Sequence, residues 1–131
     1  MGYPQANMPI KVLLIEDDHT MITLLRTLLR IEGFEVALLE SDESLEAILA
    51  SIRKDKPDVA LLDVHLRQVN GLDLLYAIRE DPECHDMHVI MSSGIDFGQQ
   101  CLDGGADAFI LKPYMPEDLI SKLRQVSANG S

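Results

Sequence analysis

The chain has 131 residues, of which 47% are apolar and 25% charged, a composition typical of one globular domain that buries a full core. Its formal net charge of −11 argues against direct binding to nucleic acid or an anionic membrane, since both carry negative charge themselves. No apolar run approaches the roughly 20 residues that a membrane-spanning helix needs, so we expect no contact with a membrane.

The two ends of the chain and its cysteines indicate how the domain is bounded. Residues 1–9 form a polar segment without signal-peptide features and are expected to be a flexible lead. The domain should cover residues 10–127, followed by a flexible tail at 128–131. Cys84 and Cys101 stand apart, without the spacing of a disulfide framework or a metal site. Isolated thiols are typical of a reducing compartment, which predicts a cytoplasmic location.

Five short apolar runs predict buried strands, and a segment with helical spacing follows each of them. Thr20 is a capping residue type and is expected to start the first helix, which Gly33 ends. Ser41 or Asp42 should cap the second helix, and Pro116 suits the first turn of the last one. The predicted strands cover residues 11–15, 34–39, 59–62, 88–91 and 108–111.

The alternation of strand and helix predicts an α/β fold. The strands are nearly continuous apolar runs, which is typical of a parallel sheet covered on both faces. Right-handed crossovers then give an open, doubly wound sheet, whose sites lie at the carboxyl ends of the strands. The stretch 95–105 contains Gly98, Gly104 and Gly105 and has room for only a short fourth helix.

Polar side chains stand where four of these strands end. Glu16 and Asp17 follow the first strand, Asp63 ends the third, and Ser93 and Lys112 follow the fourth and fifth. Neighbouring carboxylates favour a cation between them, and a set of oxygen ligands suits Mg²⁺ or Mn²⁺. A lysine can neutralise a phosphoryl oxygen, and a serine hydroxyl can donate to another. This combination predicts phosphoryl transfer with Asp63 as the nucleophile.

The chain resembles the receiver domain of two-component response regulators over about residues 10–127. The resemblance rests on Glu16-Asp17-Asp18 after the first strand, on Gly71 eight residues after Asp63, on Ser-Ser-Gly after the fourth strand, and on Gly-Ala-Asp-Ala-Phe-Ile-Leu-Lys-Pro at 105–113. It implies a flavodoxin-like fold with five helices around a five-stranded parallel sheet in the order 2-1-3-4-5.

The resemblance also implies a metal site around Asp63. Asp63 matches the phosphorylated aspartate, Asp17 a direct ligand of Mg²⁺ or Mn²⁺, and Glu16 a ligand that acts through water. The backbone carbonyl of His65 should complete the set, because it lies two residues after the phosphorylated aspartate. Asp18 then becomes a loop residue beside the site, since Glu16 stands where the family's first acid does.

Further residues match positions that stabilise or report the phosphoryl group. Lys112 matches the family's lysine, and the Lys112–Pro113 peptide bond is expected to be cis, as in similar domains. Ser93 matches the hydroxyl that turns towards the phosphoryl group, and Phe109 matches the aromatic residue that follows it inward. Ser92 competes with Ser93 for this role, but the hydroxyl normally stands just before a small residue, which favours Ser93.

The implied function is a signalling switch. A phosphohistidine on a histidine kinase or a histidine phosphotransfer protein donates its phosphoryl group to Asp63, and water later removes it. The change alters the surface of the fourth helix, fifth strand and fifth helix, which a downstream output domain or protein reads. A phosphorylation-dependent dimer is one form of this output. The domain then catalyses only its own phosphorylation and dephosphorylation and is not otherwise an enzyme.

The chain departs from the family pattern in two ways that affect this interpretation. The stretch from Ser93 to Lys112 is about three residues shorter than usual, roughly one helical turn, which casts doubt on dimerisation through the fourth helix. Arg67 replaces a usual proline and either contacts the site or is solvated. Two other functions stay open. One is a pseudo-receiver that signals without phosphorylation, and the other is an aspartyl phosphatase similar to haloacid dehalogenase-type enzymes.

Overall fold

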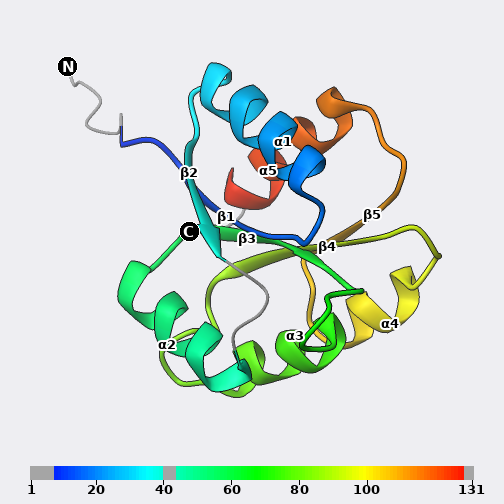
Figure 1. Cartoon of the computed structure of the whole chain (residues 1–131). Coiled ribbons are helices and arrows are strands. Elements are labelled where there is room, and N and C mark those ends of the chain that lie inside the picture. Colours follow the sequence, from blue (N-terminus) through cyan, green and yellow to red (C-terminus); the bar gives the residue numbers. More distant parts are fainter. Residues whose placement is uncertain (1–7, 40–43, 129–131) are drawn as a thin grey trace.

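Five parallel strands form the central layer of the computed structural model, which describes residues 8–39 and 44–128 (Figure 1). The strands pair in the order β2-β1-β3-β4-β5. This arrangement confirms the predicted parallel sheet and its strand order. The strands are β1 (Lys11–Ile15), β2 (Glu35–Leu39), β3 (Val59–Asp63), β4 (His88–Ser93) and β5 (Ala108–Leu111).

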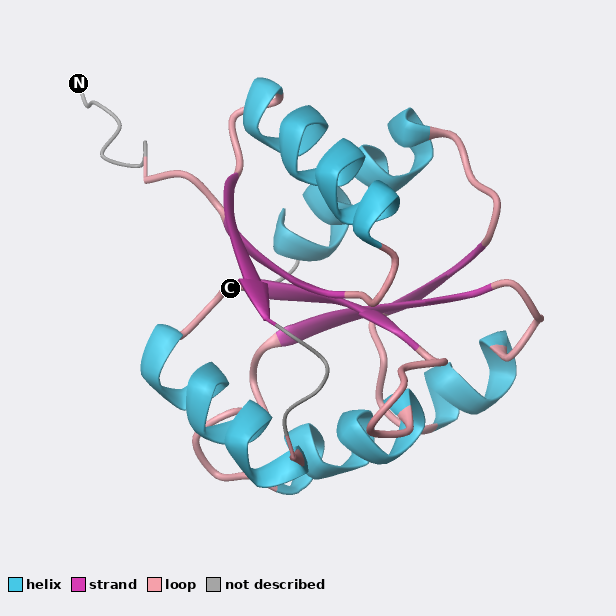
Figure 2. Cartoon of the chain, viewed as in Figure 1, coloured by secondary structure: helices cyan, strands magenta, loops and turns pink. Residues whose placement is uncertain are grey.

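Helices cover both faces of the sheet (Figure 2). On one face lie α1 (His19–Ile31) and α5 (Pro116–Ala128), and on the other lie α2 (Leu45–Asp55), α3 (Gly71–Glu80) and α4 (Gly98–Asp103). The short fourth helix was predicted, and α4 has six residues. In the part of the chain that the structure describes, no helix has the length and apolar character needed to cross a bilayer.

The sheet separates two hydrophobic cores because side chains of a strand point alternately to its two faces. In β1, Leu13 and Ile15 pack into the core beneath α2, α3 and α4. Val12 and Leu14 pack into the core beneath α1 and α5. Burial on both faces explains why the strands are continuous apolar runs rather than alternating ones.

Two helices begin at residues other than those predicted. Asp18 caps α1, because its backbone is extended and its Oδ1 accepts hydrogen bonds from the backbone nitrogens of Thr20 and Met21 at 3.0 and 3.2 Å. The prediction that Thr20 caps this helix was therefore wrong. Ser44 caps α2 through a 3.1 Å bond to its Oγ, whereas Ser41 and Asp42 lie outside the described residues.

The end of the chain differs by one residue from the expectation. Helix α5 includes Ala128, which the sequence pattern assigned to the tail. The remainder of the predicted tail, 129–131, and residues 1–7 of the predicted lead lie outside the described residues.

A buried carboxylate joins α3 to α2. Asp81, at the end of α3, accepts hydrogen bonds from the guanidinium of Arg53 through its Oδ2 and from the backbone nitrogen of Glu83 through its Oδ1. These bonds lower the pKa of Asp81 to about 2, and the bond from Arg53 has the largest effect. The carboxylate form is therefore the one that the folded state stabilises.

Replacing Asp81 by asparagine should lower the melting temperature by several degrees at pH 6. The pKa of Asp81 falls from 3.8 to about 2 on folding, so its contribution is present above pH 4 and disappears as the pH falls through about 2. Thermal unfolding followed by circular dichroism at pH 6 and pH 2 measures this. Asp86→Asn, at a carboxylate whose side chain is 95% exposed, is the matched control. A gap between Asp81→Asn and wild type that stayed constant with pH would contradict the assignment.

Candidate functional site

Four strand ends bring polar side chains to the carboxyl edge of the sheet. Glu16 follows β1, Asp63 is the last residue of β3, Ser93 is the last residue of β4, and Lys112 follows β5. Strand β1 lies at the point where the chain order of the sheet reverses, between β2 and β3. In open parallel sheets this edge, next to such a reversal, is where ligands bind.

Lys112 connects two of these carboxylates. Its Nζ donates hydrogen bonds of 2.9 Å to Glu16 Oε1 and of 2.9 Å to Asp63 Oδ2. Both carboxylates are buried, with exposed fractions of 9% for Glu16 and 7% for Asp63. A single ammonium group thus partly neutralises two carboxylates that are held away from water, where charge interactions are strong.

The shifts in pKa follow from this arrangement. Burial raises the pKa of Glu16 and the nearby charge of Asp63 adds to the rise, although the hydrogen bond from Lys112 opposes it. Burial alone would lower the pKa of Lys112, but its hydrogen bonds to Asp63 and Glu16 outweigh burial and raise it. Lys112 therefore remains a cation at this site throughout the physiological pH range.

Backbone amides hold the other carboxylate oxygens. Asp63 Oδ1 accepts a 3.1 Å hydrogen bond from the nitrogen of His65. Glu16 Oε2 accepts bonds from the nitrogens of Asp17 and Asp18, and Asp17 Oδ2 accepts a 2.7 Å bond from the nitrogen of Arg67. Arg67 thus contacts the acidic pair through its backbone nitrogen, and the residue as a whole is exposed. The contact expected of Arg67 from the sequence was one through its charged side chain.

Ser93 and Phe109 face the same side of the sheet. Met91 pairs in register with Phe109, and both pack into the core beneath α3 and α4. Because side chains alternate along a strand, Ser93 shares this face with Met91, whereas Ser92 points to the opposite face. Ser93 is fully buried and its Oγ accepts a 3.0 Å hydrogen bond from the nitrogen of Ile95. This geometry places Ser93, and not Ser92, on the sheet face of Phe109, whereas Asp63 pairs in register with Ser92. The choice of Ser93 as the residue that responds to events at Asp63 stays a prediction.

The sequence and the fold have relatives among known proteins. The sequence matches the family model for the response regulator receiver domain over residues 12–124. The chain belongs to this family. The receiver domain is 34% identical over 119 residues to the transcriptional regulatory protein CpxR of Escherichia coli, with 88% of this chain and 48% of CpxR covered.

Two further comparisons extend this result. The receiver domain is 30% identical over 114 residues to the DNA-binding response regulator MtrA of Mycobacterium tuberculosis, covering 87% of this chain and 49% of MtrA. It therefore spans about half the length of these two relatives. A crystal structure of a putative response regulator from Chloroflexus aurantiacus superposes with a TM-score of 0.83 and 27% identity, covering 92% of this chain and 99% of that one.

The oxygen atoms around Asp63 fit a hard cation. Within residues 8–39 and 44–128, no group of three or more His, Cys, Asp or Glu side chains is arranged to hold a metal ion. Mg²⁺ does not require such a group, because it usually keeps several waters and binds only one or two carboxylates. Asp17, Asp63 and the carbonyl of His65 are oxygen donors of this kind. Glu16 is less suited to direct ligation, because one of its oxygens is engaged by Lys112.

The loop after β5 holds a residue that the sequence patterns did not identify. The Lys112–Pro113 peptide bond is cis, and Tyr114 follows it. The Tyr114 hydroxyl is buried and has no hydrogen-bond partner among the described residues. Burial raises the pKa of Tyr114 to about 12, so this hydroxyl stays protonated. Its position directly after Lys-Pro is the only sequence signal that could have pointed to it.

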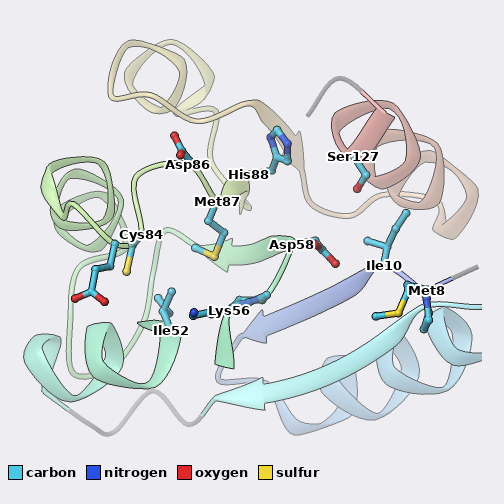
Figure 3. Close-up of a pocket in the computed structure, with 13 residues that line it drawn as sticks. Met8, Ile10, Ile52, Lys56, Asp58, Cys84, Asp86, Met87, His88 and Ser127 are labelled. Carbon is cyan, nitrogen blue, oxygen red and sulfur yellow. The ribbon is translucent and has the colours of Figure 1, made fainter. Parts of the chain in front are cut away.

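A separate cavity of about 680 Å³ lies at the opposite edge of the sheet (Figure 3). Ile10, Asp58 and Met87 line it, and each directly precedes a strand, so the cavity lies at the amino ends of β1, β3 and β4. Cys84 also lines it, but burial raises the pKa of this thiol to about 11, which leaves it unreactive at neutral pH. The cavity is therefore remote from the chemistry at Asp63.

Proposed function

We propose that this receiver domain accepts a phosphoryl group on Asp63 from a phosphohistidine of a histidine kinase or histidine phosphotransfer protein. The observation that supports this most strongly is the position of Lys112 between Asp63 and Glu16. A carboxylate with a fixed cation beside it can receive a phosphoryl group without a large rearrangement of charge. A domain built only to bind a partner has no need of a partly buried ammonium group bonded to this carboxylate.

The transfer step balances as follows. An oxygen of the Asp63 carboxylate attacks the phosphorus and the P–N bond of the phosphohistidine breaks. The electron pair of that bond stays on the ring nitrogen, and the imidazole, which carries a proton on its other nitrogen, leaves as a neutral group. Lys112 neutralises charge on the phosphoryl oxygens as they approach. Bound Mg²⁺ or Mn²⁺, held by Asp17, Asp63 and the His65 carbonyl with Glu16 acting through water, would supply further positive charge there.

Removal of the phosphoryl group returns the domain to its starting state. Water attacks the phosphorus, the P–O bond to Asp63 breaks, and the products are the carboxylate and inorganic phosphate. The domain thus catalyses only its own phosphorylation and dephosphorylation. Because nothing else is turned over, the lifetime of the phosphoryl group sets the duration of the signal.

The switch runs through Ser93. Its hydroxyl oxygen accepts a bond from the nitrogen of Ile95, and in the phosphorylated state the hydroxyl turns to donate to a phosphoryl oxygen. Phe109 then moves into the space that Ser93 leaves on the same sheet face. This changes the surface of α4, β5 and α5, which a downstream output domain or protein reads, either directly or through a phosphorylation-dependent dimer.

Intact-mass spectrometry tests the proposal. Incubation with a small phosphodonor and Mg²⁺ should add about 80 Da, the mass of one phosphoryl group, to the wild-type chain but not to Asp63→Asn. Chelation of Mg²⁺ should abolish the gain. An unmodified wild-type chain would instead favour a pseudo-receiver, and continued turnover of a small phosphoester would favour a phosphatase.

A further inference from the structure

The ring of His65 rests against the ring of Phe97. The ring centroids lie 5.5 Å apart with an interplanar angle of 60°, an edge-to-face arrangement. His65 belongs to the loop between β3 and α3, and Phe97 directly precedes α4. The contact therefore joins the loop that follows Asp63 to the start of α4, a helix of the proposed output surface.

The His65 side of this contact is tied to Asp63. The nitrogen of His65 donates to Asp63 Oδ1 at 3.1 Å. Phosphorylation converts the Asp63 carboxylate into an acyl phosphate, in which one oxygen is esterified and the carboxyl group loses its charge. The amide of His65 then loses its charged acceptor, and charge-assisted bonds are roughly twice as strong as neutral ones.

The Phe97 side of this contact is tied to Ser93. Ile95, two residues before Phe97, donates its amide to Ser93 Oγ at 3.0 Å. In the proposed switch the Ser93 hydroxyl turns towards the phosphoryl group, which weakens this bond. The two hydrogen bonds that change on phosphorylation thus lie on the two chain segments that meet at the His65–Phe97 contact.

Phe97 and Gly98 also set the position of α4. The carbonyl of Phe97 accepts the first hydrogen bond of the helix, from the nitrogen of Cys101 at 3.0 Å. The Phe97 side chain makes no cap hydrogen bond, but Asp96 Oδ1 accepts a 2.9 Å bond from the nitrogen of Gly98, so Asp96 and the packing of Phe97 together hold this end of α4. Gly98 lies against the Phe109 ring, and a Cβ at this position would come within 3.3 Å of Phe109 Cδ2.

We propose that the His65–Phe97 contact holds α4 in place in the unphosphorylated domain and transmits the state of Asp63 to α4. The second half of this statement rests on the proposed function. Because α4 has only six residues, it is marginal as an isolated helix. One aromatic contact at its first turn is therefore enough to shift how often it opens.

Hydrogen exchange of the Cys101 amide, followed by NMR, tests the first half without phosphorylation. In His65→Ala this amide should exchange roughly two- to tenfold faster than in wild type, the range for loss of one aromatic pair. His65→Phe keeps a ring at this position and should restore slow exchange. His85→Ala, which removes a half-exposed histidine on another loop, is the matched control, and the amide of Ile52, a buried residue within α2, reports any global loss of stability.

A double-mutant cycle separates the contact from general packing of Phe97. Phe97→Leu should also speed exchange at Cys101, and adding His65→Ala to Phe97→Leu should cause no further change. Exchange in His65→Ala equal to wild type, or full additivity of the two substitutions, would overturn the proposal.

The second half is tested with beryllofluoride and Mg²⁺, which mimic the phosphoryl group without hydrolysis. In wild type the mimic should speed exchange at Cys101, and in His65→Ala it should add little. An equal effect of the mimic on exchange in wild type and in His65→Ala would overturn the signalling role of the contact. The proposed function would still stand in that case if the phosphodonor adds mass at Asp63. Absence of the mass gain would overturn both the proposed function and the signalling role of the contact. The exchange rates of the unphosphorylated variants would still decide whether the contact holds α4 in place.

Discussion

Replacement of Lys112 by methionine should slow phosphorylation of Asp63 by a small phosphodonor roughly 10²- to 10³-fold. This is the usual effect of removing one preorganised hydrogen-bond donor that stabilises charge in a transition state. Methionine keeps much of the length and apolar stem of the side chain but removes the ammonium group. The rate is measured as the growth of the phosphorylated species by intact-mass spectrometry at saturating Mg²⁺.

The size of this effect follows from the burial of the site. Glu16 and Asp63 are both less than a tenth exposed, and Lys112 is the cation that the structure places within hydrogen-bonding distance of both. Without it, an incoming phosphoryl group meets two negative groups in a region of low dielectric constant. The substitution should therefore impair the transfer step more than the fold.

Lys54→Met is the matched control, because Lys54 is exposed in the last turn of α2, remote from the carboxyl edge of the sheet. It should phosphorylate at the wild-type rate. Circular dichroism on both variants verifies that they are folded under the conditions of the assay. A Lys112→Met rate within about threefold of wild type, well short of the expected loss, would show that Lys112 is not needed for charge stabilisation.

Asp17→Asn should weaken Mg²⁺ binding to the unphosphorylated domain at least roughly tenfold, since even residues that only orient metal ligands are worth 10- to 100-fold in affinity. In the wild type Asp17 Oδ2 accepts a 2.7 Å hydrogen bond from the nitrogen of Arg67. The side-chain oxygen of asparagine can still accept this bond. The loop should therefore keep its shape while the site loses one negative charge. Isothermal titration calorimetry with Mg²⁺ measures the change.

The neighbouring acid provides a sharp comparison. Asp18 caps α1, and asparagine is an equally good capping residue, so Asp18→Asn should bind Mg²⁺ with nearly wild-type affinity. The result tests the assignment of Asp17 and not Asp18 to the metal site. Equal affinities in the two variants would contradict that assignment, and a greater loss in Asp18→Asn would reverse it.

The fold was predictable because each strand is a short, branched apolar run that is buried on both faces. Helix ends were less predictable, because several capping residue types follow one another before α1. Asp18 and Thr20 both suit the role, and the choice depends on which backbone is extended at the turn. The six-residue α4 was anticipated from the shortened, glycine-rich stretch between Ser93 and Lys112.

The site was predictable only in outline. Strand ends placed Glu16, Asp63, Ser93 and Lys112 at one edge, as the structure shows. The bond of Lys112 to Glu16 was not foreseen, because it depends on which rotamer a flexible lysine adopts between two acids. The His65–Phe97 contact could not be predicted, because it joins two loops that are far apart in the sequence and no sequence pattern links them. The hydrogen bond from the backbone nitrogen of Arg67 to Asp17 could not be predicted from the residue type, because every residue except proline has a backbone N–H.

The central claim is that a phosphoryl group is carried by Asp63, and chemical trapping followed by peptide mapping measures this most directly. Borohydride reduces an acyl phosphate to an alcohol, so it converts a phosphorylated aspartate into homoserine at the position that carried the group. After treatment with a small phosphodonor and Mg²⁺, we predict homoserine at position 63 and unmodified residues elsewhere. A phosphoryl group recovered on Ser93 or on a histidine, with Asp63 unchanged, would contradict the account.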